Sequence, residues 1–244
     1  MDLGLEGRRA LVTAASSGIG KACAAALAAE GARVFVSARN PEPLEAAARE
    51  IGAAGWLASD VTQENDSQEL IQAAAHQLGG LDILVTNVPD PQTGGFADAA
   101  DDSFTAAHEA TLMSVVRLVR LVRPLLADSP AGRIVNISSI AAHEWLAGRL
   151  FSATYRSALA ALAKHLSIEL APHEIAVNTI APGNIITPLW DEESASSAAE
   201  SVPLGRLGDA HEIGSLCAYL CSVQAAYITG QSIVVDGGLI KTIP

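Results

Sequence analysis

The sequence predicts an α/β protein in which a doubly wound, mostly parallel sheet is covered by helices on both faces. Short β-branched runs alternate with longer Ala/Leu-rich stretches of helical period along the whole chain. Apolar runs such as Ile83–Val85 are continuous, as in strands that are buried on both faces. The length of 244 residues suits one large α/β domain spanning residues 1–244.

The elements follow one another in strand–helix order. Strands are predicted at Arg9–Ala14, Arg33–Ala38, Gly55–Ser59, Ile83–Asn87, Arg133–Ser138, Ile175–Ile180 and Ser232–Val235. Helices are predicted at Ile19–Glu30, Glu42–Ile51, Gln63–Leu78, Asp101–Leu126, Ser152–Leu170 and Asp209–Ser222. The segment Pro188–Pro203 lacks a clear period, and we expect it to be an irregular lid over a binding site.

Composition narrows the function classes. The net charge of -12 argues against nucleic acid or an anionic membrane as a partner, because both require a basic patch. No apolar run reaches 18 residues, and the first residues lack the order of a signal peptide, so we expect a cytoplasmic protein. The three cysteines are Cys23, Cys217 and Cys221; we interpret them as buried thiols and predict no metal site.

A small-residue loop joins the first strand to the first helix. It reads Thr13-Ala14-Ala15-Ser16-Ser17-Gly18-Ile19-Gly20. Small residues let the backbone approach a diphosphate, and the helix N-terminus supplies free N–H groups and the positive end of a dipole. The position as the first strand–helix turn favours a dinucleotide site over a plain tight turn.

Residues at the ends of the second and third strands indicate which dinucleotide binds. The second strand ends without the carboxylate that would hold a ribose 2′-hydroxyl, and Arg39 follows directly. A guanidinium can bind a 2′-phosphate through charge-assisted hydrogen bonds. Asp60-Val61 ends the third strand, where a carboxylate can accept from an adenine amino group. We therefore predict NADP(H); the alternative is that Arg39 is a solvated surface charge.

The chain resembles the short-chain dehydrogenase/reductase family, in its β-ketoacyl-carrier-protein-reductase-like branch, from Leu5 to Leu239. The motifs that carry the resemblance are the Thr13–Gly20 loop, Asp60-Val61, Leu81–Asn87, Gly132–Ser139, Val177–Gly183, Pro203–Gly208 and Tyr227–Gly238. The resemblance implies a Rossmann-type domain whose seven parallel strands lie in the order 3-2-1-4-5-6-7. It also implies a homotetramer, or a homodimer, that pairs the two long helices predicted at 101–126 and 152–170.

The resemblance also implies roles for residues beyond the phosphate loop. Asn87 would lie beside the adenine ribose. Pro182-Gly183 would pass under the nicotinamide, and Ile185 and Thr187 would contact its carboxamide.

The catalytic positions depart from the family, whose members reduce a carbonyl with Ser, Tyr and Lys, supported by Asn. Ser139 fits the Ser position, but counting from the flanking motifs puts Ser152 at the Tyr position, Arg156 at the Lys position and Thr111 at the Asn position. Ala14 and Val88-Pro89 also replace family glycine and Ala-Gly residues.

The proton donor is left open by these replacements. Hydride transfer to carbon develops charge on oxygen, which needs a nearby donor. The candidates are Ser152 acting through water, Tyr155 one helical turn along, and His143 in the loop after Ser139. Arg156 keeps the positive charge of the lost Lys and can hold ribose hydroxyls, a substrate carboxylate or a halide, or serve as a structural charge.

Three functions remain in competition. The favoured one is an NADP(H)-dependent oxidoreductase acting on a small carbonyl or alcohol substrate with an altered proton donor. The second is a non-redox lyase in the same pocket, similar to halohydrin dehalogenases, although these have given up the cofactor loop. The third is a catalytically inactive NADPH-binding protein.

Overall fold

The computed structural model describes residues 2–187 and 190–242. Seven parallel strands form one sheet in the order β3-β2-β1-β4-β5-β6-β7, which confirms the predicted fold class and strand order. The strands are β1 (Arg9–Val12), β2 (Arg33–Ala38), β3 (Gly55–Ala58), β4 (Ile83–Thr86), β5 (Arg133–Ile137), β6 (Ala176–Pro182) and β7 (Ser232–Val235).

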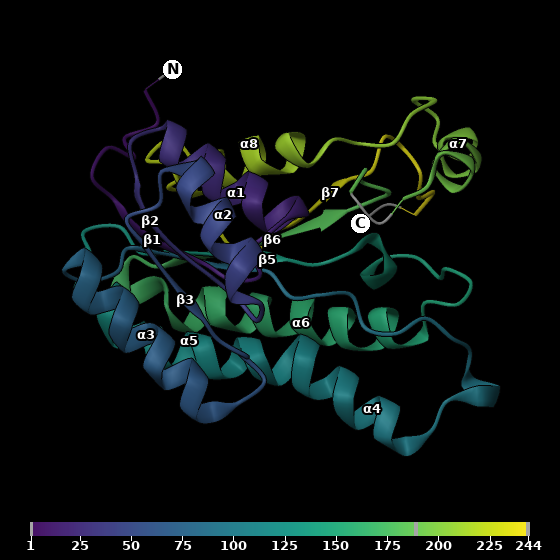
Figure 1. Ribbon diagram of the computed structural model, residues 1–244, viewed down its shortest axis with the longest axis horizontal. Coiled ribbons are helices and arrows are strands. Elements are labelled where there is room, and N and C mark those ends of the chain that lie inside the picture. Colours follow the sequence, from purple (N-terminus) through teal and green to yellow (C-terminus); the bar gives the residue numbers. More distant parts are fainter. Residues whose placement is uncertain (1, 188–189, 243–244) are drawn as a thin grey trace.

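Helices cover both faces of the sheet (Figure 1). One face carries α1 (Gly18–Ala29), α2 (Pro41–Ile51) and α8 (Ala210–Cys221). The other carries α3 (Glu64–Leu78), α5 (Ser114–Ala127) and α6 (Leu150–Glu169). Two further helices, α4 (Asp101–His108) and α7 (Glu192–Glu200), lie at the right-hand end of the view, below and above the sheet.

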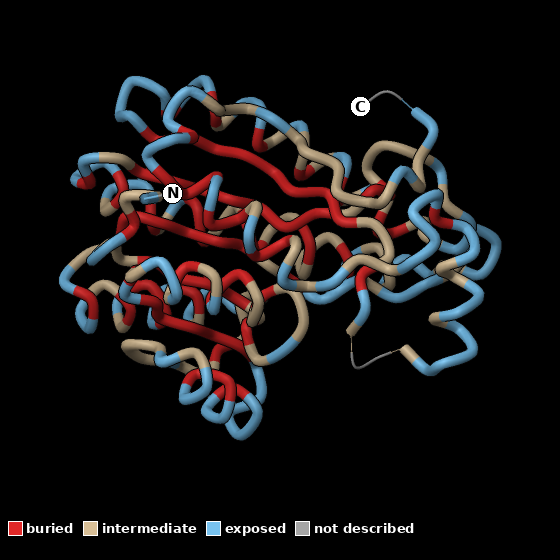
Figure 2. Tube along the Cα trace, turned by 90° about the horizontal axis from the view of Figure 1, so that it is seen from above, coloured by how far each residue is buried: buried red, intermediate tan, exposed pale blue. Residues whose placement is uncertain are grey.

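Two apolar clusters, one on each face of the sheet, form the core. The first packs Leu27 of α1 and Ile213 of α8 against Val12, and the second packs Leu118 of α5 and Leu159 of α6 against the opposite face. Every residue of β4, β5 and β6 is buried, as the continuous apolar runs predict. Figure 2 shows these buried strands inside a shell of exposed helix surfaces and loops.

The helix predicted at Asp101–Leu126 is present as a helical segment, but it is not one regular α-helix, which corrects that part of the prediction. A π-helical turn, η2 (Glu109–Met113), separates α4 from α5, and Thr111 is buried within it. Just after it, the Ser114 hydroxyl donates to the Ala110 carbonyl at 2.6 Å. Single π-helical turns inside α-helices are rare and have no residue signature of their own, so the sequence did not reveal this one.

The segment predicted to be irregular contains a helix, which is a second correction. Asp191 caps α7 by accepting from the backbone N–H of Ser194 at 2.8 Å. The Ala/Ser-rich residues of α7 have few apolar side chains, and this weak periodicity hid the helix. Pro188 and Leu189, which belong to the predicted lid, lie outside the described residues.

The other predicted elements are present with shifted ends. The first strand stops at Val12 rather than Ala14, the long helix α6 begins at Leu150 rather than Ser152, and β6 runs on to Pro182. Short 3-10 turns at Phe96–Asp98, Ile140–Ala142 and Ala171–His173 were not predicted. In the described part of the chain no helix has the length and apolar character needed to cross a membrane.

Candidate active site

A cleft of about 350 Å³ opens at the carboxyl ends of the strands, beside the point where the strand order reverses between β1 and β4. In doubly wound folds this is where ligands bind. Loops after β1, β2, β3 and β4 and one face of α4 form its walls. The lining residues include Ala14, Ser16, Ser37–Asn40, Ser59–Thr62, Asn87–Gln92, Ser103, Ala106, Ala107 and Ala110.

The predicted phosphate loop has the geometry that a diphosphate requires. The helix α1 begins at Gly18, its cap residue Ser17 forms no side-chain capping bond, and its first turn carries no acidic side chain. A Cβ at Gly20 would lie 2.3 Å from the Ala14 carbonyl oxygen, so only glycine fits there. Free N–H groups and the helix dipole therefore face the end of β1.

Ala14 adopts a conformation that normally calls for glycine. Its φ is 47°, and within residues 2–187 and 190–242 Glu174 is the only other non-glycine residue with positive φ. This is the position where the family resemblance expects glycine. The loop therefore keeps the left-handed conformation that suits glycine, although this conformation is strained for alanine.

Thr13 and Asn87 join the phosphate loop to the end of β4. The Thr13 hydroxyl donates to the Asn87 carbonyl at 2.8 Å and accepts from the Asn87 N–H at 3.0 Å. The Asn87 side-chain amide donates to the Ala14 carbonyl at 3.1 Å. Both residues thus hold the two strands of the crevice in register.

The residues predicted to select the adenosine half lie on the cleft wall. Arg39 is exposed there, and no carboxylate of the described chain forms an ion pair with it. Asp60 and Val61 lie across the same cleft, with one Asp60 carboxylate oxygen accepting from both the N–H and the hydroxyl of Thr62. The guanidinium and the neighbouring Ser16 are therefore placed to meet an anionic group.

The segment after β6 approaches the phosphate loop from the other side. The Gly183 N–H donates to the Val235 carbonyl at 2.9 Å, and a Cβ at Gly183 would lie 2.8 Å from Cα of Asp236. Ile185 is buried, whereas the Thr187 methyl lies 3.6 Å from where a Cβ at Gly18 would stand. The structure thus brings Thr187 to the N-terminus of α1.

Three polar atoms at the catalytic positions are buried without partners. Thr111, Ser152 and Arg156 are 0%, 3% and 3% exposed. Within the described residues the hydroxyls of Thr111 and Ser152 and the Nε of Arg156 have no hydrogen-bond partner. Ser139 differs, because its hydroxyl accepts from the N–H of Ala141 at 3.2 Å and caps a 3-10 turn.

Arg156 is enclosed by the chain that follows β4. Its Nη1 donates to the Ile137 carbonyl at 2.8 Å, and its Nη2 donates to Asp90 at 3.2 Å and to the Val88 carbonyl at 3.5 Å. Burial lowers the pKa of the Arg156 guanidinium, while the Asp90 carboxylate opposes that shift. The guanidinium stays charged, because arginine side chains are not deprotonated in folded proteins.

The two other candidate proton donors each contact a residue outside the four catalytic positions. Tyr155 packs against His108 of α4, with ring centroids 5.6 Å apart. The His143 Nε2 lies 2.8 Å from the Ser232 hydroxyl of the edge strand β7. Neither residue lines the cleft described above, and neither do the other catalytic candidates Thr111, Ser139, Ser152 and Arg156. The contact of His143 was not foreseen, because it joins positions 89 residues apart.

Sequence reasoning missed two residues of this region. Asp90 and Arg149 form an ion pair at 2.9 Å, and Asp90 also bridges to Arg156. The only sequence feature that pointed to Asp90 was the replacement of the family's Ala-Gly by Val88-Pro89 just before it. Trp190, just after the undescribed residues 188–189, donates from its indole N–H to the Ile185 carbonyl at 2.9 Å. Among the described residues no group of three or more His, Cys, Asp or Glu side chains has the arrangement of a metal site.

The fold and the crevice are those of a dinucleotide-binding oxidoreductase scaffold. Similarity to known proteins identifies the family. The family model described as "Enoyl-(Acyl carrier protein) reductase" matches residues 13–240. The chain belongs to the short-chain dehydrogenase/reductase family, as the motifs predict.

Named relatives cover nearly the full chain. The 3-oxoacyl-[acyl-carrier-protein] reductase of Vibrio cholerae is 34% identical over 241 residues, which is 97% of this chain and 99% of the relative. L-xylulose reductase of Bos taurus is 32% identical, with 99% and 100% covered. A solved structure of L-sorbose reductase from Gluconobacter frateurii, complexed with NADPH and L-sorbose, aligns with a TM-score of 0.95 at 32% identity, covering 100% of each chain.

Proposed function

We propose that this protein is an NADP(H)-dependent oxidoreductase that acts on a small carbonyl or alcohol substrate. The observation that carries the proposal is the crevice: an uncapped helix N-terminus behind a small-residue loop, with the exposed Arg39 on the wall. The structural similarity to an L-sorbose reductase complexed with NADPH supports the same cofactor. The enzyme would transfer hydride between this cofactor and the substrate.

The residues of the crevice fit the cofactor part by part. The N–H groups of Ser17–Gly20 would hold the diphosphate, with the Ser16 and Thr187 hydroxyls close by. Arg39 would hold the 2′-phosphate, and Asp60-Val61 would border the adenine. The strand end at Pro182-Gly183 and the buried Ile185 would support the nicotinamide end, and the nicotinamide supplies the hydride when bound.

The proton donor that we propose is water, positioned by Ser139 and Ser152. Ser139 stands at the end of β5 and can donate its hydroxyl to a carbonyl oxygen, because that hydroxyl only accepts in the turn it caps. Ser152 has an unpartnered buried hydroxyl, whereas the His143 imidazole contacts the Ser232 hydroxyl and the Tyr155 ring packs against His108. A positioned general acid contributes about 10²–10⁴-fold. We therefore expect turnover slower by about that factor than with an intact Tyr and Lys.

A second candidate function is an NADP(H)-binding protein without catalysis. The observation that favours it is the enclosure of Arg156, whose Nη atoms both donate within the protein. In relatives the cation at this position is expected to bind the cofactor ribose. Here the Arg156 guanidinium is already bound within the protein and would not reach the ribose. Binding without turnover would distinguish this candidate from a slow enzyme.

The cofactor assignment is tested by titrating the purified protein with NADPH and NADH, following nucleotide fluorescence. A charge-assisted hydrogen bond is worth about 1.5–3 kcal/mol, or about 10–100-fold in affinity. Arg39→Asp should weaken NADPH binding by at least this factor and leave NADH nearly unchanged. Arg49→Asp, an exposed arginine of α2, is the control for net charge. Equal binding of both nucleotides by the unaltered protein would refute the assignment.

The chemistry is tested by NADPH oxidation with a panel of ketones. Ser152→Tyr combined with Arg156→Lys puts the family Tyr and Lys in place, with Thr111 unchanged, and should raise kcat by about 10²-fold or more. Slow NADPH oxidation by the unaltered protein supports the proposed enzyme. Oxidation by the double variant alone supports the non-catalytic candidate. If neither protein reduces any ketone although NADPH binds, the reductase proposal fails.

The assembly and location are also proposals. A homotetramer or homodimer, with no nucleic acid or membrane as partner, fits the acidic chain and the partly apolar surface of α6, where Ile168 is 68% exposed. Sedimentation equilibrium would test the assembly, and fractionation of cells would test the proposed cytoplasmic location.

A further inference from the structure

The chain after β4 is fixed to the start of α6 at two separate points. Gly94 pairs with Arg149 in a parallel bridge, and the Gly94 N–H donates to the Gly148 carbonyl at 2.8 Å. Asp90 supplies the second point through its carboxylate. The position of that carboxylate on the cleft wall is therefore defined by backbone as well as by side-chain contacts.

Two guanidinium groups converge on the Asp90 carboxylate, one on each oxygen. Arg156 Nη2 lies 3.2 Å from Oδ1, and Arg149 Nη1 lies 2.9 Å from Oδ2. The Arg156 side chain is 4% exposed, Arg149 38% and Asp90 50%. A carboxylate between two arginines is the arrangement by which proteins bind carboxylate ligands, except that here the carboxylate belongs to the chain itself.

The buried arginine requires an anion at this place. The Ile137 and Val88 carbonyls orient its Nη atoms, but carbonyl oxygens carry no full charge, and Nε has no partner among the described residues. A buried guanidinium without a counter-charge strongly destabilises a fold. Because Asp90 is half exposed and lines the cleft, a ligand that enters the cleft can reach the same position once the side chain is removed.

We propose that Asp90 is a specificity-determining residue: its carboxylate fills a two-arginine anion site on the crevice wall, so the site accepts uncharged carbonyl or alcohol ligands and rejects carboxylates. While Asp90 is in place, an incoming carboxylate meets a negative charge and two engaged guanidiniums. Without Asp90, the two arginines carry an uncompensated charge of +2 and bind a small carboxylate. The substrate part of this inference rests on the proposed function, whereas the anion site does not.

The test is chemical rescue of Asp90→Gly, read as the thermal unfolding midpoint during titration with sodium formate against sodium chloride at equal ionic strength. Formate should raise the midpoint of the variant saturably, with half-saturation on the order of 1 mM or weaker, the limit for a ligand of three heavy atoms. The unaltered protein should not respond beyond the chloride control. Asp90→Gly with Arg149→Gln should lose most of the response, because one arginine is gone.

Pyruvate and methyl pyruvate test the specificity in the same assay. Pyruvate should raise the unfolding midpoint of Asp90→Gly and not that of the unaltered protein. Methyl pyruvate, which carries no carboxylate, should have the same effect on the midpoints of both proteins. If Asp90→Gly does not fold alone, Asp90→Ser takes its place, and recovery of folded protein in formate becomes the measure. A response of the unaltered protein equal to that of the variant, or no saturable response of either variant, overturns the proposal. If the protein does not bind NADPH, the proposed function is overturned. The formate and pyruvate results then still decide whether Asp90 fills a two-arginine anion site.

Discussion

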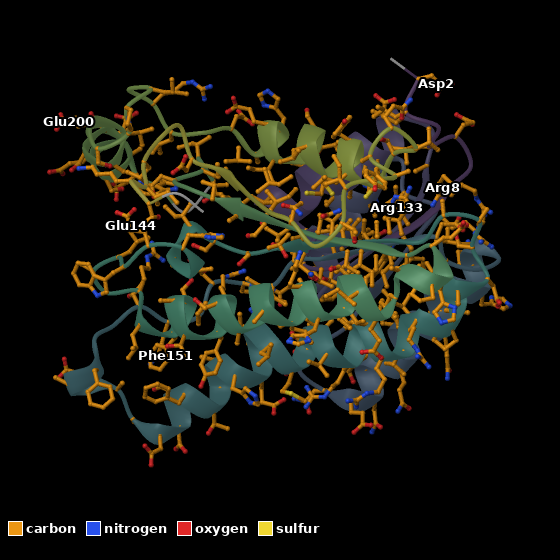
Figure 3. All side chains as sticks on the ribbon, turned by 180° about the vertical axis from the view of Figure 1, so that it is seen from behind. Asp2, Arg8, Arg133, Glu144, Phe151 and Glu200 are labelled. Atoms are coloured by element: carbon orange, nitrogen blue, oxygen red, sulfur yellow. The ribbon has the colours of Figure 1, made fainter. Side chains whose placement is uncertain are left out.

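Asp82 joins the three central strands at the end of the sheet opposite the crevice, and it makes the stability of the protein sensitive to acid. Its carboxylate accepts from the backbone N–H and Nε of Arg9 at 2.9 Å each and from Nη2 at 2.7 Å. The Asp82 backbone pairs with Arg9 of β1 and Arg133 of β5. Figure 3 shows Arg8 and Arg133 together at this end, far from Phe151 and Glu144.

The magnitude follows from the pKa of Asp82. Burial disfavours the ionised form, but hydrogen bonds from the Arg9 side chain and backbone and from Ser129 outweigh it and lower the pKa from 3.8 to about 2. That difference is worth about 2 kcal/mol of folding free energy, at about 1.4 kcal/mol per pKa unit. Because the folded-state pKa is the lower one, this stability is present above about pH 4 and is lost as the pH falls through about 2.

Urea unfolding between pH 2 and pH 7 measures this contribution. Asp82→Asn should lower the free energy of unfolding at pH 7 by about 2 kcal/mol and flatten its decline between pH 4 and pH 2. Asp128→Asn, at an exposed carboxylate, is the matched control and should change neither. NADPH affinity should stay the same, since Asp82 lies at the other end of the strands. An equal decline between pH 4 and pH 2 with and without Asp82 would show that the reasoning is wrong.

Two further predictions concern the phosphate loop. Gly20→Ala should lower the free energy of unfolding by about 1–3 kcal/mol and weaken NADPH binding, because the added Cβ would lie 2.3 Å from the Ala14 carbonyl oxygen. Thermal unfolding measures the stability and nucleotide titration measures the affinity. Unchanged values of both would contradict the geometry. Ala14→Gly should raise the free energy of unfolding by about 0.5–1 kcal/mol, because relief of left-handed strain of about 1–2 kcal/mol exceeds the entropic cost of glycine of about 0.5–1 kcal/mol; a loss of stability would contradict it.

The fold was predictable because its determinants are local. The central strands contain short apolar runs such as Ile83–Val85 and Ile134-Val135, and most covering helices show a helical period. The alternation of strands and helices and the parallel pairing therefore follow from short stretches of sequence. The two wrong predictions arose where this local pattern fails. The π-helical turn around Thr111 has no residue pattern of its own, and α7 has too few apolar residues to display a helical period.

The cofactor crevice was largely predictable for a similar reason. The loop from Thr13 to Gly20 is one contiguous motif, and its required conformation is visible in its residue types. The preference for NADP(H) rests on Arg39, one residue beyond a strand whose end the pattern locates well. Both inferences use neighbours in sequence, and the similarity to an NADPH-complexed reductase supports them.

The catalytic end could not be predicted because its determinant is a pair of distant residues. Arg156 was interpreted as a cation for ribose hydroxyls, for a substrate carboxylate or halide, or as a structural charge, since its position replaces a lysine. The carboxylate that it contacts belongs to Asp90, 66 residues earlier. An ammonium donates three hydrogen bonds from one atom, whereas a guanidinium spreads five N–H groups over a plane and needs more partners when buried. Arginine at 156 and aspartate at 90 therefore act as one unit, so their substitutions should not be additive. Because the two residues lie 66 positions apart and no local pattern joins them, their pairing is visible only in the folded chain.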